Sequence, residues 1–370
     1  MKKKILSYLL ASGFLFFASC GTDTPDPVAC ETTAPNSYEF THEGNNTVGY
    51  DGQTKRLLMV DEIMTLLGLE TTTDVSLLNQ MYADGTGFTG EGLDASGKQV
   101  RSKTAGYQSA TVKAAIQSLF DAWLLDYAEN VAPALANMTD AAPGVAGWVG
   151  SRELNSKGME LDQLFAKGLI GALCLDQTIN GYLSNAKLSI ADNESRDSED
   201  YYTTMEHYWD EGFGYIYGKD TDLSNDEILN DNLLGKYLTK YADHRLTVFN
   251  AFKAGRQAIV DGCMDERDNQ AKIIQETLSK VVAIRAEFYL RDAADKVDLS
   301  ADYFHSLSEG YGFIMSLQFT MDENGNPYFT HEEVNSMLDQ LGSGDGFWDR
   351  TDSELVQMAD DINAVTGVTL

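Results

Sequence analysis

The chain has little of several residue types, and each shortage excludes something. Among 370 residues there are 27 lysines and arginines against 57 aspartates and glutamates, so the formal net charge is −30. This balance excludes nucleic acids and anionic lipid headgroups as partners attracted by charge. Only four cysteines occur, and after Cys20 three remain, an odd number that excludes a complete disulfide framework. We expect Cys174, in the apolar run 169–175, to be a buried small hydrophobic residue.

Common catalytic signatures are also missing. No His-Glu-x-x-His, Gly-x-Ser-x-Gly or phosphate-loop sequence occurs, so no motif indicates an enzyme. Beyond the N-terminal residues, no apolar run is long enough to cross a bilayer. Few stretches alternate between apolar and polar residues with a period of two. The patterns instead repeat with helical spacing, which predicts an all-α protein.

The N-terminus has the composition of a secretory signal. Three lysines, residues 2–4, precede an apolar run from Ile5 to Ala18, which is too short to be a transmembrane helix. The run ends in Phe17-Ala-Ser-Cys20, which resembles a bacterial lipobox, in which the cysteine is acylated. We therefore expect a signal peptide at 1–19, a lipid anchor on Cys20 and a tether at 20–36. These place the protein on the cell envelope, on its periplasmic or cell-surface side.

One phrase occurs twice and organises the rest of the chain. Residues 207–216 and 305–314 both read His-x-x-x-Glu-Gly-aromatic-Gly-aromatic-Ile, without a gap. Such a match indicates an internal duplication. We predict a helical domain at 37–370 with an N-terminal excursion, two repeats at about 110–217 and 245–317, and C-terminal helices. The repeats are expected to be helical bundles related by a pseudo-twofold axis. Helices are expected at 54–67, 74–83, 110–136, 158–186, 200–216, 228–241, 245–263, 269–297, 303–317, 331–341 and 352–365.

Histidine and glutamate four residues apart lie on one face of a helix. If the two phrase helices meet, their side chains form a site for iron or another divalent metal. The candidate ligands are His207, Glu211, His305 and Glu309, with Asp210 and Glu160 as further candidates. The alternative is that each His–Glu pair is a hydrogen-bonded structural unit in its own half, because a buried carboxylate needs a partner.

Two further features of the sequence predict contacts. The glycines of the phrase, at positions 212, 214, 310 and 312, each cost roughly 1 kcal/mol relative to alanine inside a helix. We expect close approach of a neighbouring helix to offset that cost. Arg256 and Arg285 lie in otherwise apolar helices, and we expect them to pair with Glu211 or Glu309.

Several segments resemble a family of Bacteroidota lipoproteins known as domain of unknown function 4856. They are Tyr50-Asp-Gly-Gln-Thr-Lys-Arg-Leu-Leu-Met59, Lys157-Gly-Met-Glu160 with Gln163, residues 167–172, 205–215 and 255–259, and the second phrase. The layout is more distantly similar to the imelysin-like proteins, which are duplicated helical bundles associated with iron uptake. Imelysins carry a glutamate three residues after histidine, whereas here the acid shared by both copies comes four residues after it.

This resemblance implies a binding component on the envelope that acts in the acquisition of iron, another metal or a metal carrier. An outer-membrane transporter is the implied partner, besides the membrane that holds the lipid anchor. A metallohydrolase that uses the paired His and Glu residues is one alternative. A structural interaction module without a ligand is another.

Overall fold

The computed structural model describes residues 30, 32–68 and 74–368. Residues Thr32–Leu370 form one compact unit, and the protein is mostly helical. The α-helices are α1 (Asp51–Leu67), α2 (Val75–Asn79), α3 (Ala110–Asp126), α4 (Ala132–Ala136), α5 (Leu161–Leu169), α6 (Asn185–Leu188), α7 (Thr204–Tyr217), α8 (Leu234–Leu238), α9 (Ala242–Asp261), α10 (Met264–Ala294), α11 (Ala301–Ser316), α12 (His331–Gly342) and α13 (Asp352–Thr366). Two small antiparallel hairpins accompany them, β1 (Thr41–His42) with β2 (Asn45–Asn46) and β3 (Gly147–Val149) with β4 (Arg152–Leu154).

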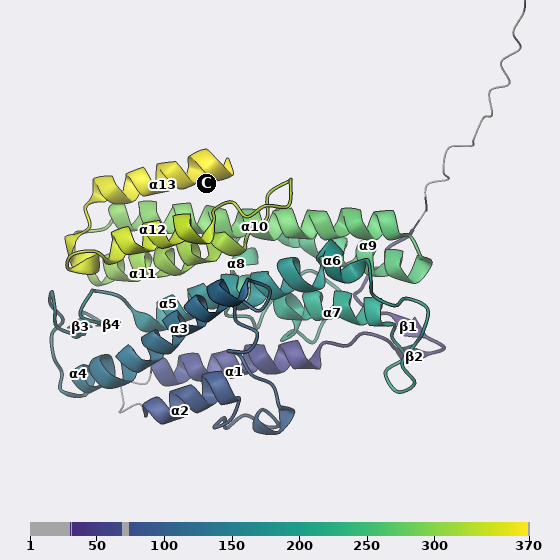
Figure 1. The fold of residues 1–370 in the computed structure, drawn as a ribbon, viewed down its shortest axis with the longest axis horizontal. Coiled ribbons are helices and arrows are strands. Elements are labelled where there is room, and N and C mark those ends of the chain that lie inside the picture. The colour runs from purple at the N-terminus through teal and green to yellow at the C-terminus, as the bar shows by residue number, and fades with distance from the viewer. Residues whose placement is uncertain (1–29, 31, 69–73, 369–370) are drawn as a thin grey trace, which may run out of the picture. The chain divides into compact units, whose positions relative to one another are not determined.

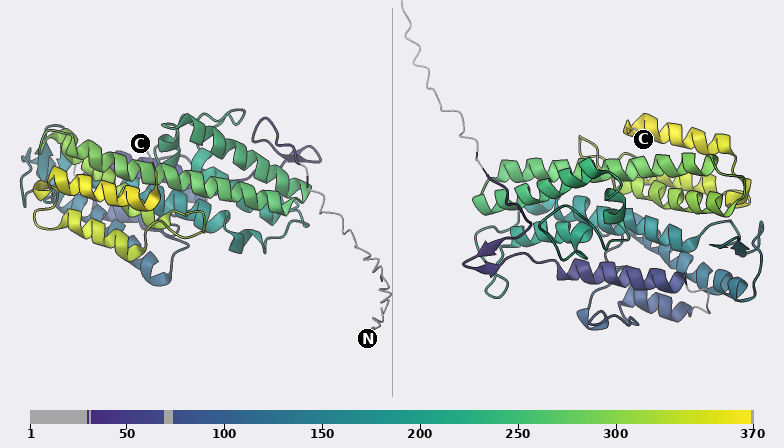
Figure 2. Two further views of the ribbon diagram at one scale, coloured as in Figure 1. Left: turned by 90° about the horizontal axis from the view of Figure 1, so that it is seen from above. Right: turned by 180° about the vertical axis from the view of Figure 1, so that it is seen from behind.

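The helices lie in layers around one hydrophobic core (Figures 1 and 2). Helix α10 runs along most of the length of the helical body, and α9 and α11 pack against it. A middle layer holds α5, α7 and the π-helical segment η4 (Ile170–Tyr182). Helix α1 covers α5 and α7 from the side opposite α10, and α12 and α13 lie outermost beyond α11 and α10. Both phrase helices, α7 and α11, are therefore enclosed by other helices.

Helix starts follow from local sequence. Thr203, Thr330 and Thr351 each form a capping box with the glutamate three residues later, at the beginnings of α7, α12 and α13. Ser300 caps α11 by accepting the backbone N–H of Tyr303. Such caps satisfy backbone N–H groups that the first helical turn leaves without partners. They fix where each phrase helix begins, and thus which way its side chains point.

Several of the expected helices differ from those observed. Those predicted at 74–83 and 110–136 contain π-helical segments, η1 (Gln80–Asp84) and η3 (Tyr127–Val131). The helix predicted at 228–241 is wrong in length, since only α8 forms there. The Asp231 carboxylate accepts the backbone N–H groups of Leu233 and Gly235 at 3.2 and 2.6 Å, which holds a turn instead of a helix. The helix predicted at 158–186 is divided into α5, η4 and α6. Within it, the N–H of Gly171 donates to the Ser316 hydroxyl of α11, and a side chain inserted into the hydrogen-bond ladder interrupts an α-helix.

The predicted signal peptide at 1–19 and lipid anchor at Cys20 lie outside the described residues, as does most of the tether at 20–36. Among the residues that are described, no helix is both long and apolar enough to span a membrane. Cys174 is a free, fully buried thiol, as its apolar surroundings predicted.

Candidate functional site

The phrase glycines lie where neighbouring helices approach closely, as predicted. A Cβ atom on Gly214 would lie 2.5 Å from Cβ of Tyr50, just before α1, and one on Gly312 would lie 2.4 Å from Cβ of Lys167 on α5. A Cβ on Gly212 would meet Leu183 at 3.3 Å, and one on Gly310 would meet Tyr289 at 3.2 Å. The second glycine of each phrase thus has the tighter contact.

The first phrase forms a polar cluster between α7, α1 and η4. Glu211 accepts hydrogen bonds from the amide of Gln53 at 2.9 Å and from the hydroxyl of Tyr182 at 3.0 Å. The Nε2 atom of His207 lies 3.9 Å from Glu211. The imidazole ring stacks on the ring of Tyr202, with 4.3 Å between the ring centres. Its Nδ1 atom is buried and has no hydrogen-bond partner among the residues that the structure describes.

The second phrase forms a more strongly charged cluster between α11, α5 and α8. Glu309 accepts the hydroxyl of Tyr237 at 2.8 Å and forms an ion pair with Lys167 at 3.2 Å. Lys167 is only 4% exposed, and Glu309 is 6% exposed, so this ion pair lies almost entirely away from solvent. His305 Nδ1 lies 2.5 Å from Glu160, which precedes α5 and also faces Arg152 at 3.6 Å.

Burial and charge act in opposite directions on this cluster. Burial lowers the pKa of Lys167, although Glu309 opposes the shift. Burial alone would raise the pKa of Glu309, but Lys167 and the hydroxyls of Tyr289 and Tyr237 outweigh it and hold the pKa below its usual value. Burial raises the pKa of Glu160, against the opposing effect of its hydrogen bond with His305. Lys167 and Glu309 therefore form a charged pair whose partners stabilise each other.

A cavity of about 450 Å³ opens beside this second cluster. Helices α1, α5 and α11 line it, together with residues at the start of α8. Its polar side chains are Asp61, Thr65, Gln163, Lys167, Asn232, Lys236, His305 and Glu309, and its apolar ones are Val60, Met64, Ala166 and Leu233. Lys236 is exposed, and Asp61 is held by an ion pair with Lys219. The cavity thus combines apolar walls with two lysines, a histidine, amide groups and two carboxylates, Asp61 and Glu309, each of which is paired with a lysine.

The structure does not gather the six candidate metal ligands into one site. In the parts of the chain that it covers, no group of three or more His, Cys, Asp or Glu side chains is placed to hold a metal ion. His207 and Glu211 lie in the first cluster, whereas His305 and Glu309 lie in the second. Glu160, although it precedes the first phrase in the chain, contacts His305 of the second phrase.

Asp210 belongs to a third group, formed with Arg256 and Glu206. The pairing predicted for Arg256 is therefore wrong. Arg256 pairs with Asp210 at 3.0 Å and with Glu206 at 3.1 Å, and not with Glu211. The reason is helical geometry, because residues 206 and 210 are four apart and face α9, whereas residue 211 is turned about 100° away. The prediction for Arg285 is also wrong, since its guanidinium lies over the ring of Phe288 at 4.1 Å.

Sequence reasoning missed Lys167, Gln53, Tyr182 and Tyr237 as partners of the phrase glutamates. Lys167 had a signal, because a lysine in the otherwise apolar run Leu164-Phe-Ala-Lys-Gly-Leu-Ile170 needs a buried acid. The other three residues lie far from the phrases in sequence, and ordinary helical patterns surround them.

The fold and these clusters define a mostly helical protein with partly buried polar clusters at the two phrase helices. The chain belongs to the family called domain of unknown function DUF4856, whose model matches residues 35–369. No curated protein and no solved structure matches the chain.

Proposed function

We propose that this protein is a lipid-anchored binding component of a bacterial envelope, which binds a small anionic ligand in the cavity beside the second phrase. The lipobox-like end of the signal sequence supports the anchor. We infer an anionic ligand from the nearly buried ammonium of Lys167 at the cavity wall, with Lys236 and His305 beside it. A carboxylate-bearing metal carrier, rather than a bare ion, fits these cationic donors.

Duplication is part of this proposal, and the contacts of the two phrases support it. Gly212 and Gly310 each meet the Tyr-Leu pair of the preceding long helical segment, 182–183 and 289–290 respectively. Gly214 and Gly312 each meet a helix from outside that segment, near Gln53 and Lys167 respectively. Gln53 and Lys167 then reach the glutamate of their own phrase. We infer that the two halves descend from one helical unit, as in the imelysin-like layout.

The equivalence of Gln53 and Lys167 gives a mild test variant. In Lys167→Gln the positive charge is removed, while an amide remains to donate to Glu309 as Gln53 donates to Glu211. The probe is ferric citrate, measured by isothermal titration calorimetry at low ionic strength, with citrate alone alongside. We expect Lys167→Gln and Lys236→Ala to weaken binding roughly tenfold or more. Lys240→Ala, an exposed lysine one turn beyond Lys236, is the matched control.

Three outcomes are informative. Equal binding by wild type and both cavity variants excludes the cavity as the site. Binding of a neutral analogue as tight as that of citrate contradicts the anionic ligand class. Stabilisation by ferrous iron or zinc alone, lost in both His207→Ala and His305→Ala, supports a metal site that uses the phrase histidines. A metal that binds the folded state, present at one hundred times its dissociation constant, stabilises the fold by about 2.7 kcal/mol. A thermal melt detects a stabilisation of this size.

A further inference from the structure

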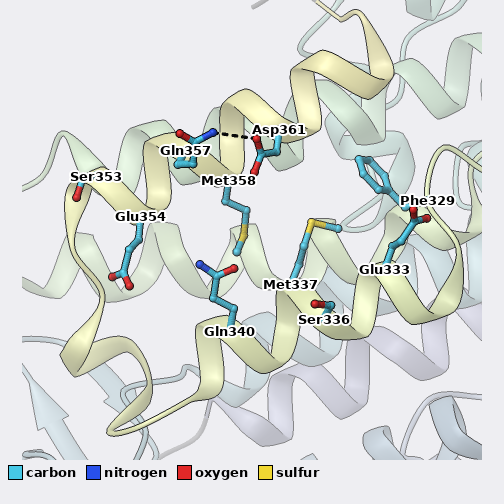
Figure 3. A pocket seen from close by; sticks show the side chains of 10 residues that line it. All are labelled: Phe329, Glu333, Ser336, Met337, Gln340, Ser353, Glu354, Gln357, Met358 and Asp361. Atoms are coloured by element: carbon cyan, nitrogen blue, oxygen red, sulfur yellow. Dashed lines mark hydrogen bonds between the residues drawn. The ribbon is translucent and has the colours of Figure 1, made fainter.

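A groove lies between α12 and α13, two helices that follow the second phrase in the chain. Helix α12 packs on α11 and α13 packs on α10, so each is supported from below and the space between them stays open. The cavity in this groove measures about 410 Å³. The two helices run antiparallel, with Met358 of α13 facing Met337 and Gln340 of α12, and Glu333 lying at the end of the groove beside Phe329 (Figure 3).

The floor of the groove is apolar and adaptable. Phe329, Met337 and Met358 line it, and the two methionines point toward one another from the facing helices (Figure 3). Methionine side chains are flexible and polarizable, so they repack around apolar groups of different shapes. Met337 is partly exposed, which leaves its thioether accessible from the groove.

The walls of the groove are strongly acidic. Helices α12 and α13 carry seven carboxylates between them and no lysine or arginine. Arg291 pairs with Asp360 at 2.7 Å and Arg350 with Glu354 at 3.7 Å, which offsets part of this charge. Glu333 and Asp361 line the groove itself. Both interact there with uncharged groups, Glu333 with the cap residue of its own helix and Asp361 with the Gln357 amide.

We propose that this groove docks a basic amphipathic helix of a partner protein. An apolar side chain of that helix inserts between Met337 and Met358, and its lysines or arginines face Glu333 and Asp361. The length of α12, about 18 Å for its 12 residues, accommodates three turns of a docked helix. Charge complementarity selects this occupant, because the carboxylates repel an acidic helix and an anionic lipid surface. The docking surface is separate from the ligand cavity of the proposed function.

The test uses a designed 14-residue helical peptide with leucines along one face and lysines on the other. Fluorescence anisotropy measures its affinity for the full chain, and hydrogen exchange locates the binding site. We expect protection of α12 and α13, and affinity about tenfold weaker for Met337→Asp. Asp361→Lys is expected to weaken binding severalfold more than Asp339→Lys. Asp339 is an exposed carboxylate on α12 that does not line the groove, so this second substitution is the matched control.

Several results overturn the proposal. One is no measurable binding of the Leu/Lys peptide, and another is protection that maps away from α12 and α13. Equal weakening by Asp361→Lys and Asp339→Lys means that only overall charge attracts the peptide. Equal binding by a peptide with glutamates in place of the lysines contradicts the charge argument. If Met337→Asp proves unstable in a thermal melt, Met337→Gln and the two charge variants decide the question.

Discussion

The close approach at Gly312 gives a sharp test of how the second phrase is held. In Gly312→Ala the new methyl carbon would lie 2.4 Å from Cβ of Lys167 and 2.9 Å from the backbone nitrogen of Gly168. Neither atom can rotate away, so α11 and α5 must separate by roughly 1 Å to restore an ordinary contact. Overpacking of this kind costs about 1–3 kcal/mol, and alanine regains about 1 kcal/mol of helix propensity. Because the methyl group meets a Cβ and backbone atoms that cannot move alone, we expect the upper end of the overpacking range, about 3 kcal/mol, and thus a net loss of about 2 kcal/mol in the free energy of unfolding.

Urea unfolding followed by circular dichroism measures this loss. Gly214→Ala is expected to cost about as much, since its methyl carbon would lie 2.5 Å from Cβ of Tyr50. Gly310→Ala and Gly212→Ala are expected to change stability by less than about 1 kcal/mol, because their nearest neighbours are 3.2 and 3.3 Å away. Gly342→Ala, whose methyl carbon would lie 3.7 Å from the terminal methyl group of Met159, is the control. Should Gly312→Ala prove as stable as wild type, the close packing of α11 on α5 is not the reason for that glycine.

Three further predictions concern two buried charged residues and the attachment of the protein to the membrane. Arg256→Met leaves Asp210 and Glu206 buried with one positive partner fewer, so chemical unfolding should show a loss of about 3–5 kcal/mol; a loss below about 1 kcal/mol contradicts the ion-pair assignment. Burial raises the pKa of Asp176 to about 6; since this is above its value in the unfolded chain, the carboxyl's contribution to stability falls as pH rises from about 4 to about 6. The stability of wild type relative to Asp176→Asn should therefore fall across that range and stay constant above it, and a rise would refute the assignment. Cys20→Ser should release the protein from the membrane fraction or change its processing, whereas unchanged mass and partition argue against acylation.

The repeated phrase correctly predicted the close helix contacts at its glycines. It did not correctly predict that the two phrase helices share one site. Glycines inside a helix have a cost that only packing offsets, so Gly214 and Gly312 could be assigned to helix contacts from sequence alone. Whether the two phrase helices meet each other depends on the order in which other helices pack between them. That order is set by many weak apolar contacts distributed along α1, α5 and α10, and no single residue pattern records it.

Some helix boundaries are set by residues near them in sequence, and others by residues far away in sequence. The starts of α7, α12 and α13 follow from Thr-x-x-Glu sequences that can be read directly. The break of the expected 158–186 helix depends on the hydroxyl of Ser316, which is 145 residues from Gly171. Only the folded chain brings these two groups together, so periodicity alone predicts an unbroken helix.

The two phrases differ in the side chain that contacts their glutamate. At equivalent places beside the second glycine of each phrase stand Gln53 and Lys167, and both contact the glutamate of their own phrase. Gln53 satisfies Glu211 with a neutral amide, so the first half needs no further charge. Lys167 gives the second half an ammonium at the wall of a cavity, and in the proposed function an incoming anion shares it with Glu309. We infer that duplication supplied two equal scaffolds and that a change at one position made one of them a binding site. Exchanging the two residues, by Gln53→Lys with Lys167→Gln, should then weaken ligand binding at the second phrase. It should not create binding at the first phrase, because this cavity lies beside the second phrase.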